Sequence, residues 1–221
     1  MPTCVSPNEL LETVKRYGFG RFPSTADALA NTLNLLRRRG FAVTNTHLVV
    51  KPKSASRPNT LSAKYGTDRF PFHSDFAFSA IPPRYILLSN ATNAQFQRPT
   101  LITKVERLEP DCQSLIRNST WRLLRSERHY LVSGRFVLSG QIIWRWDCDF
   151  MQPANHAADE ACRLVPKAMS ALAEAVDWQP YSAVLIDNWS CAHARGDVGP
   201  SSDENRALMR YEFWGYARMV C

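Results

Sequence analysis

The chain has 221 residues, a net charge of +7 and 45% hydrophobic residues, which is ordinary for a globular protein large enough to bury a full core. It contains no apolar run of about 18 residues, so we expect no transmembrane helix. The N-terminus lacks a basic region followed by an apolar run, so we expect no secretory signal and a cytoplasmic location.

The six cysteines are scattered and include no Cys-x-x-Cys pair, which argues against a zinc finger or a thioredoxin-type site. We therefore expect them to be reduced, as is usual in the cytoplasm. The positive charge would suit nucleic acid, an anionic small substrate or an acidic carrier protein. Because the basic residues are spread out, and the one tight run at 37–39 ends a predicted helix, nucleic acid is the weaker interpretation.

The N-terminal part of the sequence predicts helices. Ser6 and Glu9 form a capping-box pattern, in which side chains bond to backbone N–H groups at the start of a helix. Ser24 is the expected N-cap of a second helix, which Gly40 ends. The elements predicted in this part are helices at 6–17 and 26–39, followed by short strands at 41–44 and 48–50.

Beyond residue 50 the sequence predicts mainly strands, with two more helices. Residues 53–69 are polar and rich in turn formers, which is typical of a lid or binding loop and equally of a plain surface loop. Pro166 lies inside the last helix, so we expect a kink or a break there. The predicted strands are 84–89, 99–103, several within 121–146, 184–186 and 208–216, and the helices are 108–116 and 156–176. This order indicates a mostly β domain with flanking helices, or α+β.

The pattern that carries chemistry is His73-Ser74-Asp75, with His193 far downstream. On a strand, side chains two residues apart share a face, so the imidazole and the carboxylate would point the same way. The pair lies in an apolar, aromatic run, where an ionised Asp75 needs a partner and a metal ion would supply one. Two histidines and one carboxylate are the facial triad of non-haem Fe(II) oxygenases. Arg206, shortly after His193, would offer a bidentate site for a co-substrate carboxylate.

The surroundings of these residues resemble a known family, the taurine dioxygenase-like and clavaminate synthase-like Fe(II)/2-oxoglutarate oxygenases. The similarity is carried by residues 72–75, 82–88, 99–102, and 185–195 with 205–210 after them. It implies a double-stranded β-helix (jelly-roll) core with helices packed outside. We expect a single oxygenase domain over 1–221, with helical N-terminal support in 1–45 and the core, with inserted helices, in 46–221.

The resemblance also implies roles for particular residues. His73, Asp75 and His193 match the iron ligands of the family. Thr100 and Arg206 match the residues that bind 2-oxoglutarate, and Arg210 matches a second Arg near substrate or co-substrate. Two positions depart from the family pattern, since Gln97-Arg98-Pro99 stands where a Gly-Gly pair is usual and Ala194 where Gly is common.

The implied function is a non-haem oxygenase that uses Fe(II), 2-oxoglutarate and O₂, with decarboxylation of 2-oxoglutarate to succinate. Because related halogenases replace the carboxylate at Asp75 with a small residue, its presence favours hydroxylation of a small molecule, or a desaturation or cyclisation with the same oxidant. That substrate would be amino-acid-derived or a natural-product intermediate, anionic or carrier-bound. Two alternatives stay open: a cupin-like hydrolase or isomerase that uses the same triad with zinc or manganese, and a non-catalytic basic jelly-roll module.

Several other residues have two interpretations each. Trp144 and Trp146 alternate as on a strand and would either line a pocket or pack in the core. Asp187 and Asn188 would orient the loop that carries His193 or act as plain turn residues. Cys191 would share the strand face of His193. The remaining histidines, for which we expect no metal role, are His47, His129 and His156.

Overall fold

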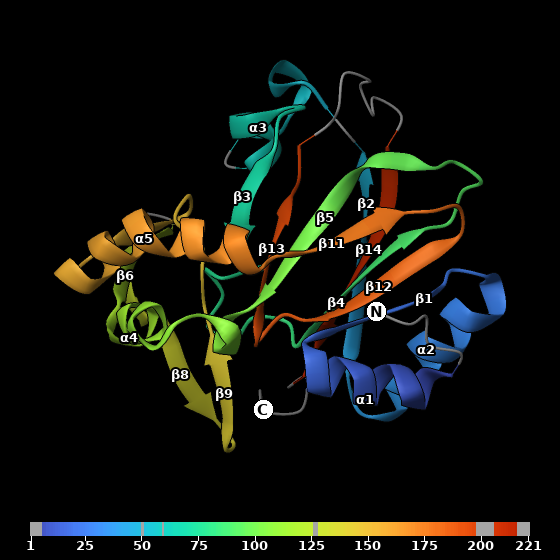
Figure 1. Cartoon of the computed structure of the whole chain (residues 1–221), viewed down its shortest axis with the longest axis horizontal. Helices are drawn as coiled ribbons and strands as arrows, with labels where there is room; N and C mark the ends of the chain where they lie inside the picture. The colour runs from blue at the N-terminus through green and yellow to red at the C-terminus, as the bar shows by residue number, and fades with distance from the viewer. Residues whose placement is uncertain (1–5, 50, 59, 126–127, 198–205, 216–221) are drawn as a thin grey trace.

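The computed structural model of the chain describes residues 6–49, 51–58, 60–125, 128–197 and 206–215. Within these ranges every strand pair is antiparallel, and two sheets form the centre of the molecule (Figure 1). The first sheet has the order β1 (Phe19–Pro23), β12 (Ser182–Asp187), β4 (Tyr85–Asn90), β14 (Ala207–Trp214), β2 (Ala42–Val49). The second has the order β11 (Glu174–Trp178), β5 (Phe96–Lys104), β13 (Cys191–Arg195), β3 (Phe70–His73).

The two sheets pack face to face around an apolar core. Along β4, Ile86 and Leu88 belong to this inter-sheet core, whereas Leu87 between them packs with the N-terminal helices on the other face. The same alternation holds in β12, where Val184 faces inward and Leu185 outward. Because both faces of the first sheet are covered, its central strands read as continuous apolar runs.

Helices α1 (Pro7–Tyr17) and α2 (Ala26–Arg38) cover the outer face of the first sheet, at the lower right of Figure 1. The Ser6 hydroxyl caps α1 by accepting a hydrogen bond from the Glu9 N–H, which confirms that start. The cap of α2 is Thr25 rather than Ser24. Ser24 is buried instead, and its hydroxyl bonds to that of Ser89 on β4.

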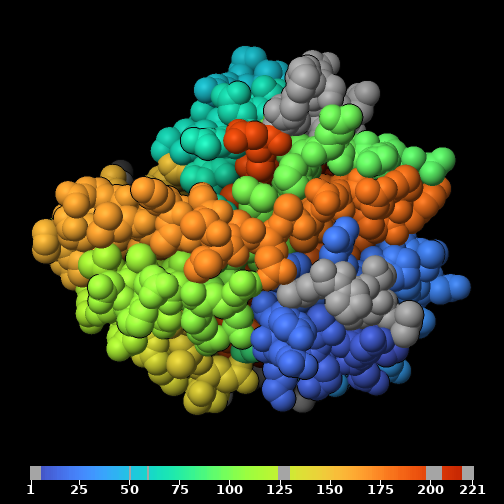
Figure 2. Space-filling view, viewed as in Figure 1, coloured from blue at the N-terminus to red at the C-terminus, as the bar shows by residue number. Residues whose placement is uncertain are grey.

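The outer face of the second sheet is covered by a helical layer and smaller strands, which form the left-hand side of Figure 2. Trp144 and Trp146 are buried in this layer, as the core interpretation predicted, and Trp146 packs edge-on against Trp121. The elements are α4 (Pro110–Asn118), α5 (His156–Leu172), β6 (Thr120–Arg125), β7 (Arg128–Ser133), β8 (Arg135–Leu138), β9 (Gln141–Trp144) and β10 (Met151–Pro153). None of the helices in the described part of the chain is long and apolar enough to span a bilayer.

Several predicted elements have different bounds in the structure. The two strands expected at 41–44 and 48–50 correspond to one strand, β2, over Ala42–Val49, and residue 50 lies outside the described residues. Because β2 lies at a sheet edge, its middle is exposed and polar, which hides the strand pattern. That strand crosses the expected boundary at 45/46, and β1 was not predicted, so residues 1–45 contribute strands as well as helices. The polar segment 53–69 contains η1 (Lys53–Ala55) and α3 (Leu61–Tyr65), and η2 (Val105–Arg107) follows β5.

The helix predicted at 156–176 ends at Leu172, Ala173 is its C-cap, and residues 174–176 belong to β11. Val176 continues the apolar pattern of the helix, but it packs in the inter-sheet core, opposite Thr100 of β5. Pro166 lies inside α5 and does not break it. Buried residues before and after it, including Val165 and Met169, hold the helix against the core despite the lost hydrogen bond.

The expectation that all cysteines are reduced is wrong for one pair, because Cys148 and Cys162 form a disulfide. It joins the loop before β10 to α5, and the Cα atoms are 6.2 Å apart, within the usual range. Among the described residues, Cys112 and Cys191 are free. A disulfide is typical of oxidising compartments, so the cysteines no longer support a cytoplasmic location.

Candidate metal centre

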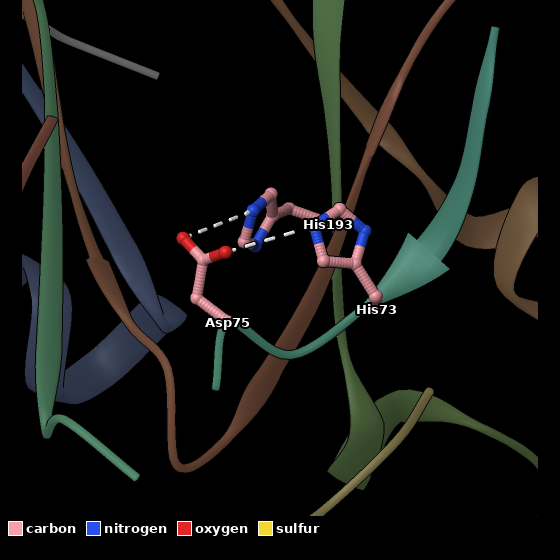
Figure 3. Close-up of side chains that lie close together, drawn as sticks. All are labelled: His73, Asp75 and His193. Carbon is pink, nitrogen blue, oxygen red and sulfur yellow. Dashed lines mark ion pairs between the residues drawn. The ribbon is translucent and has the colours of Figure 1, made fainter. Parts of the chain in front are cut away.

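His73, Asp75 and His193 lie together between the sheets (Figure 3). One ligand atom from each residue, an imidazole nitrogen or a carboxylate oxygen, lies within 4.8 Å of the other two. His73 ends β3 and His193 is the middle residue of β13, and the two are paired across the ladder with ring centroids 4.5 Å apart. Strand pairing therefore brings together two histidines that are far apart in the sequence.

Asp75 comes from the turn after β3, so the prediction that it shares a strand face with His73 is wrong. Asn188 places it instead: its side chain accepts a hydrogen bond from the Asp75 N–H at 2.8 Å and donates one to the Asp75 carbonyl at 3.0 Å. Phe76, directly after Asp75, has a φ of +57°, which is rare for a bulky residue. Two hydrogen bonds between Asn188 and the Asp75 backbone and the strained turn together point the carboxylate at the histidines.

The neighbouring Asp187 holds the turn between β12 and β13, as one of its two interpretations predicted. Its carboxylate accepts a hydrogen bond from the Trp189 N–H at 3.1 Å and pairs with Arg84, whose Nε lies 3.1 Å from Oδ1. This turn leads directly into the strand that carries His193.

Hydrogen bonds set which atoms face the centre of the cluster. Nδ1 of His73 lies 3.0 Å from the Pro71 carbonyl, so it carries the proton and leaves the Nε2 lone pair free. Nε2 of His73 is 3.8 Å from Oδ1 of Asp75, and Nε2 of His193 is 3.8 Å from Oδ2. Oδ2 of Asp75 is buried and has no hydrogen-bond partner among the described residues. A buried carboxylate that faces one imidazole nitrogen with each oxygen, and that leaves Oδ2 without a hydrogen bond, fits a divalent metal ion.

The protonation states also fit a metal. Burial, with the nearby His73, lowers the pKa of His193 to about 3, so its imidazole is neutral at neutral pH. Burial of Asp75 opposes its ionisation, but Arg210 and the two imidazoles outweigh this and lower its pKa overall. His193 is therefore neutral and Asp75 ionised, the forms in which these residue types bind metals.

The three residues line a cavity of about 540 Å³ that also contains Thr100, Arg206 and Arg210. The Thr100 hydroxyl oxygen accepts hydrogen bonds from Trp178 Nε1 at 3.1 Å and from Arg206 Nη2 at 3.3 Å. With both donors on its oxygen, the hydroxyl can direct its own proton toward a ligand acceptor. The structure thus places Thr100 beside Arg206, in the same cavity as the histidines and Asp75.

Arg210 contacts the cluster itself. Its Nη1 donates to Oδ1 of Asp75 at 3.0 Å, and its Nε donates to Oε1 of Glu212 at 2.8 Å. The resemblance placed Arg210 near substrate or co-substrate, whereas its hydrogen bonds here go to a predicted metal ligand and to a second carboxylate. Glu212 was not singled out in the sequence, where it is an ordinary charged residue of a predicted strand.

Two further arginines were also missed. Arg195 stacks on Phe70, with its guanidinium carbon 3.5 Å from the ring centroid, and donates to the carbonyls of Gly66 and Asp68. Arg98, at the position that departs from the family pattern, donates to the Asp68 carbonyl at 3.0 Å. These bonds anchor the end of the polar segment 53–69, part of which lines the cavity. For Arg195 a signal existed, because strand alternation puts it on the same face as His193.

No family model and no curated protein matches this sequence, but solved structures match its fold. An asparagine oxygenase in complex with Fe(II), (2S,3S)-3-hydroxyasparagine and succinate is 15% identical, with a TM-score of 0.65 over 94% of this chain and 78% of its own. The non-haem iron oxygenase OrfP, in complex with Fe and α-ketoglutaric acid, is 14% identical, with a TM-score of 0.62 over 94% and 79%. PvcB, an Fe, α-ketoglutarate-dependent oxygenase from an isonitrile synthetic pathway, is 12% identical, with a TM-score of 0.62 over 95% and 80%.

These likenesses establish the fold. The chain has the double-stranded β-helix of Fe(II)/2-oxoglutarate-dependent oxygenases, with helices outside it, and the predicted jelly-roll core is confirmed. Because one fold hosts many chemistries, the reaction depends on the residues of the site rather than on the fold.

Proposed function

We propose that this protein is an Fe(II)/2-oxoglutarate-dependent oxygenase that hydroxylates a small molecule. The observation that carries the proposal is the single cavity that joins His73, Asp75 and His193 to the Thr100–Arg206 pair. A metal site alone suits many enzymes, whereas a buried Arg and a hydroxyl beside it suit a dicarboxylate co-substrate.

The chain's own residues hold and orient the reactants. His73, Asp75 and His193 would hold the iron, which leaves its other positions open to ligands. Arg206 and Thr100 would bind the far carboxylate of 2-oxoglutarate by charge-assisted hydrogen bonds. When bound, iron with 2-oxoglutarate and O₂ supplies the oxidising chemistry, in which 2-oxoglutarate is decarboxylated to succinate.

The rest of the cavity suits a small substrate with both apolar and charged groups. Phe76, Phe78 and Phe150 supply aromatic surface. Asp147 is buried against this surface, with its Oδ1 accepting hydrogen bonds from backbone N–H groups, and Arg57 stands among the residues of the polar segment. An acid and a base in one cavity favour an amino-acid-derived substrate, the class to which the hydroxyasparagine bound to the similar asparagine oxygenase belongs.

The test is succinate formation from 2-oxoglutarate with Fe(II) and O₂, with and without candidate amino acids, in the wild type and in Arg206→Ala. We expect iron-dependent succinate formation, and a KM for 2-oxoglutarate that rises about 30-fold or more in the variant, because losing one partner of a buried charge pair costs about 2 kcal/mol or more. Arg122→Ala, an exposed Arg on β6, is the matched control and should leave this KM unchanged.

The alternatives predict different results. Metal binding without any response to 2-oxoglutarate would favour a cupin-like hydrolase or isomerase. Absence of both metal binding and turnover, with a salt-sensitive affinity for an acidic partner, would favour a non-catalytic module.

A further inference from the structure

Glu212 is a buried carboxylate whose hydrogen-bond partners, among the described residues, lie on β2 and on β14 itself. It lies on β14 with 1% of its surface exposed, on the same strand face as Arg210. Its Oε2 accepts a hydrogen bond from the Thr44 hydroxyl at 2.6 Å, and its Oε1 accepts one from the Thr46 hydroxyl at 3.3 Å. Oε1 also accepts from Nε of Arg210 at 2.8 Å. A buried carboxylate needs such partners, so these three hydrogen bonds hold Glu212 in one position.

Arg210 links Glu212 to the candidate metal centre. One edge of its guanidinium is bound to Glu212, and Nη1 donates to Oδ1 of Asp75 at 3.0 Å. Oδ1 of Asp75 is thereby occupied, while Oδ2 stays buried with no hydrogen-bond partner in the described part of the chain. The two oxygens of one carboxylate are therefore not equivalent.

This asymmetry matters for metal binding. A carboxylate binds a metal through one oxygen or through both, and each bound oxygen fills a coordination position. A hydrogen bond from Arg uses one lone pair of an oxygen and draws on its negative charge, so it favours the other oxygen as the metal ligand. The negative charge of Glu212 also offsets the positive charge of Arg210, which would otherwise repel a dication nearby.

We propose that Glu212 is a positioning residue that holds Arg210 on Oδ1 of Asp75, so that Asp75 presents the single oxygen Oδ2 to the metal. The inference rests on the proposed function, and it assigns to Arg210 and Glu212 the task of keeping coordination positions open for 2-oxoglutarate and O₂. Outer partners of metal ligands typically change metal affinity about 10–100-fold when they are removed.

The experiment measures Mn(II) binding by electron paramagnetic resonance, because Mn(II) reports both affinity and ligand arrangement without turnover. The proteins are the wild type, Glu212→Gln, Arg210→Met and the double variant. We expect Glu212→Gln to weaken Mn(II) binding about tenfold and to change the spectrum of the bound ion. In the Arg210→Met background the same change should have no further effect, because Glu212 acts through Arg210.

Glu174→Gln is the matched control, because Glu174 is also paired with an Arg but lies on β11, outside the cavity. It should leave both Mn(II) affinity and spectrum unchanged. If Glu212→Gln fails to fold, Thr44→Val, which removes one hydrogen bond to Glu212, should weaken Mn(II) binding in the same direction.

Two results would overturn the inference: a folded Glu212→Gln that binds Mn(II) like the wild type, or an equal loss with and without Arg210. An unchanged Thr44→Val in place of a misfolded Glu212→Gln would do the same. If either result is obtained while the wild type forms succinate, the inference about Glu212 fails and the proposed function stands. If the wild type binds no metal, the proposed function fails together with this inference.

Discussion

At the scale of single residues, the site depends on how one side chain is placed without regular secondary structure. Asp75 lies in a turn, and its backbone is held on both sides by the Asn188 amide, which also donates to the Pro83 carbonyl at 3.0 Å. Asn188 follows β12 and is buried. One amide group therefore connects the turn that carries Asp75 to the turn that leads into the strand of His193.

Asn188→Ala should weaken both the fold and metal binding. It leaves the Asp75 N–H and two carbonyls without their partner, and a buried unsatisfied polar group costs about 1–3 kcal/mol. The free energy of unfolding of the metal-free protein, measured in urea, should fall by that amount, and Mn(II) affinity should fall as well. Asn118→Ala, an exposed amide at the end of α4, is the control; equal effects in both variants would contradict the role of Asn188.

At the scale of elements, the N-terminal helices show how a cap is chosen between adjacent hydroxyl residues. Sequence reasoning assigned the cap of α2 to Ser24, but the Thr25 hydroxyl accepts the hydrogen bond from the Ala28 N–H at 3.3 Å. Ser24 is buried, and its hydroxyl is hydrogen-bonded to the Ser89 hydroxyl. Both residues are good caps locally, and β-sheet packing decides between them.

Thr25→Ala should lower the free energy of unfolding by about 1 kcal/mol, the usual value of a lost N-cap. Thr25→Ser keeps a hydroxyl at the same place and should restore most of that loss. Urea unfolding followed by circular dichroism measures both. A loss of the same size in Thr25→Ser would show that the methyl group, rather than the cap, is what stabilises the protein.

At the scale of the whole molecule, a covalent link joins the cavity wall to the outer helical layer. Cys148 directly follows Asp147, which lines the cavity, and Cys162 lies on α5. The bridge closes a loop with a sequence separation of 14 residues. Chain-entropy arguments assign about 3 kcal/mol to a disulfide that closes a loop of this length.

Cys148→Ser should therefore lower the free energy of unfolding by about 3 kcal/mol, and reductant should lower the melting temperature of the wild type but not of this variant. Cys112→Ser, which changes a free cysteine, should keep the full response to reductant. A wild type that does not respond to reductant would argue that the bridge does not constrain the unfolded chain.

Much of the architecture could be predicted because local patterns agree with the final packing. The apolar runs of β4 and β12 and the N-cap of α1 match their positions in the structure. The pattern failed where tertiary contacts outweigh local preference, as at the edge strand β2 and at the end of α5. Buried residues before and after Pro166 also keep α5 intact at that proline.

The sequence by itself determined much of the strand and helix pattern and which residues were candidates for the site, and its resemblance to known oxygenases implied the jelly-roll class. Only the tertiary structure decided how those residues meet: strand pairing joins His73 to His193, Asn188 aims Asp75, and Arg210 connects it to Glu212. The physical reason is that local patterns arise from neighbours along the chain, whereas each of these contacts joins side chains from different elements or across a turn. Burial then makes such contacts obligatory, because a polar group in the interior needs a partner.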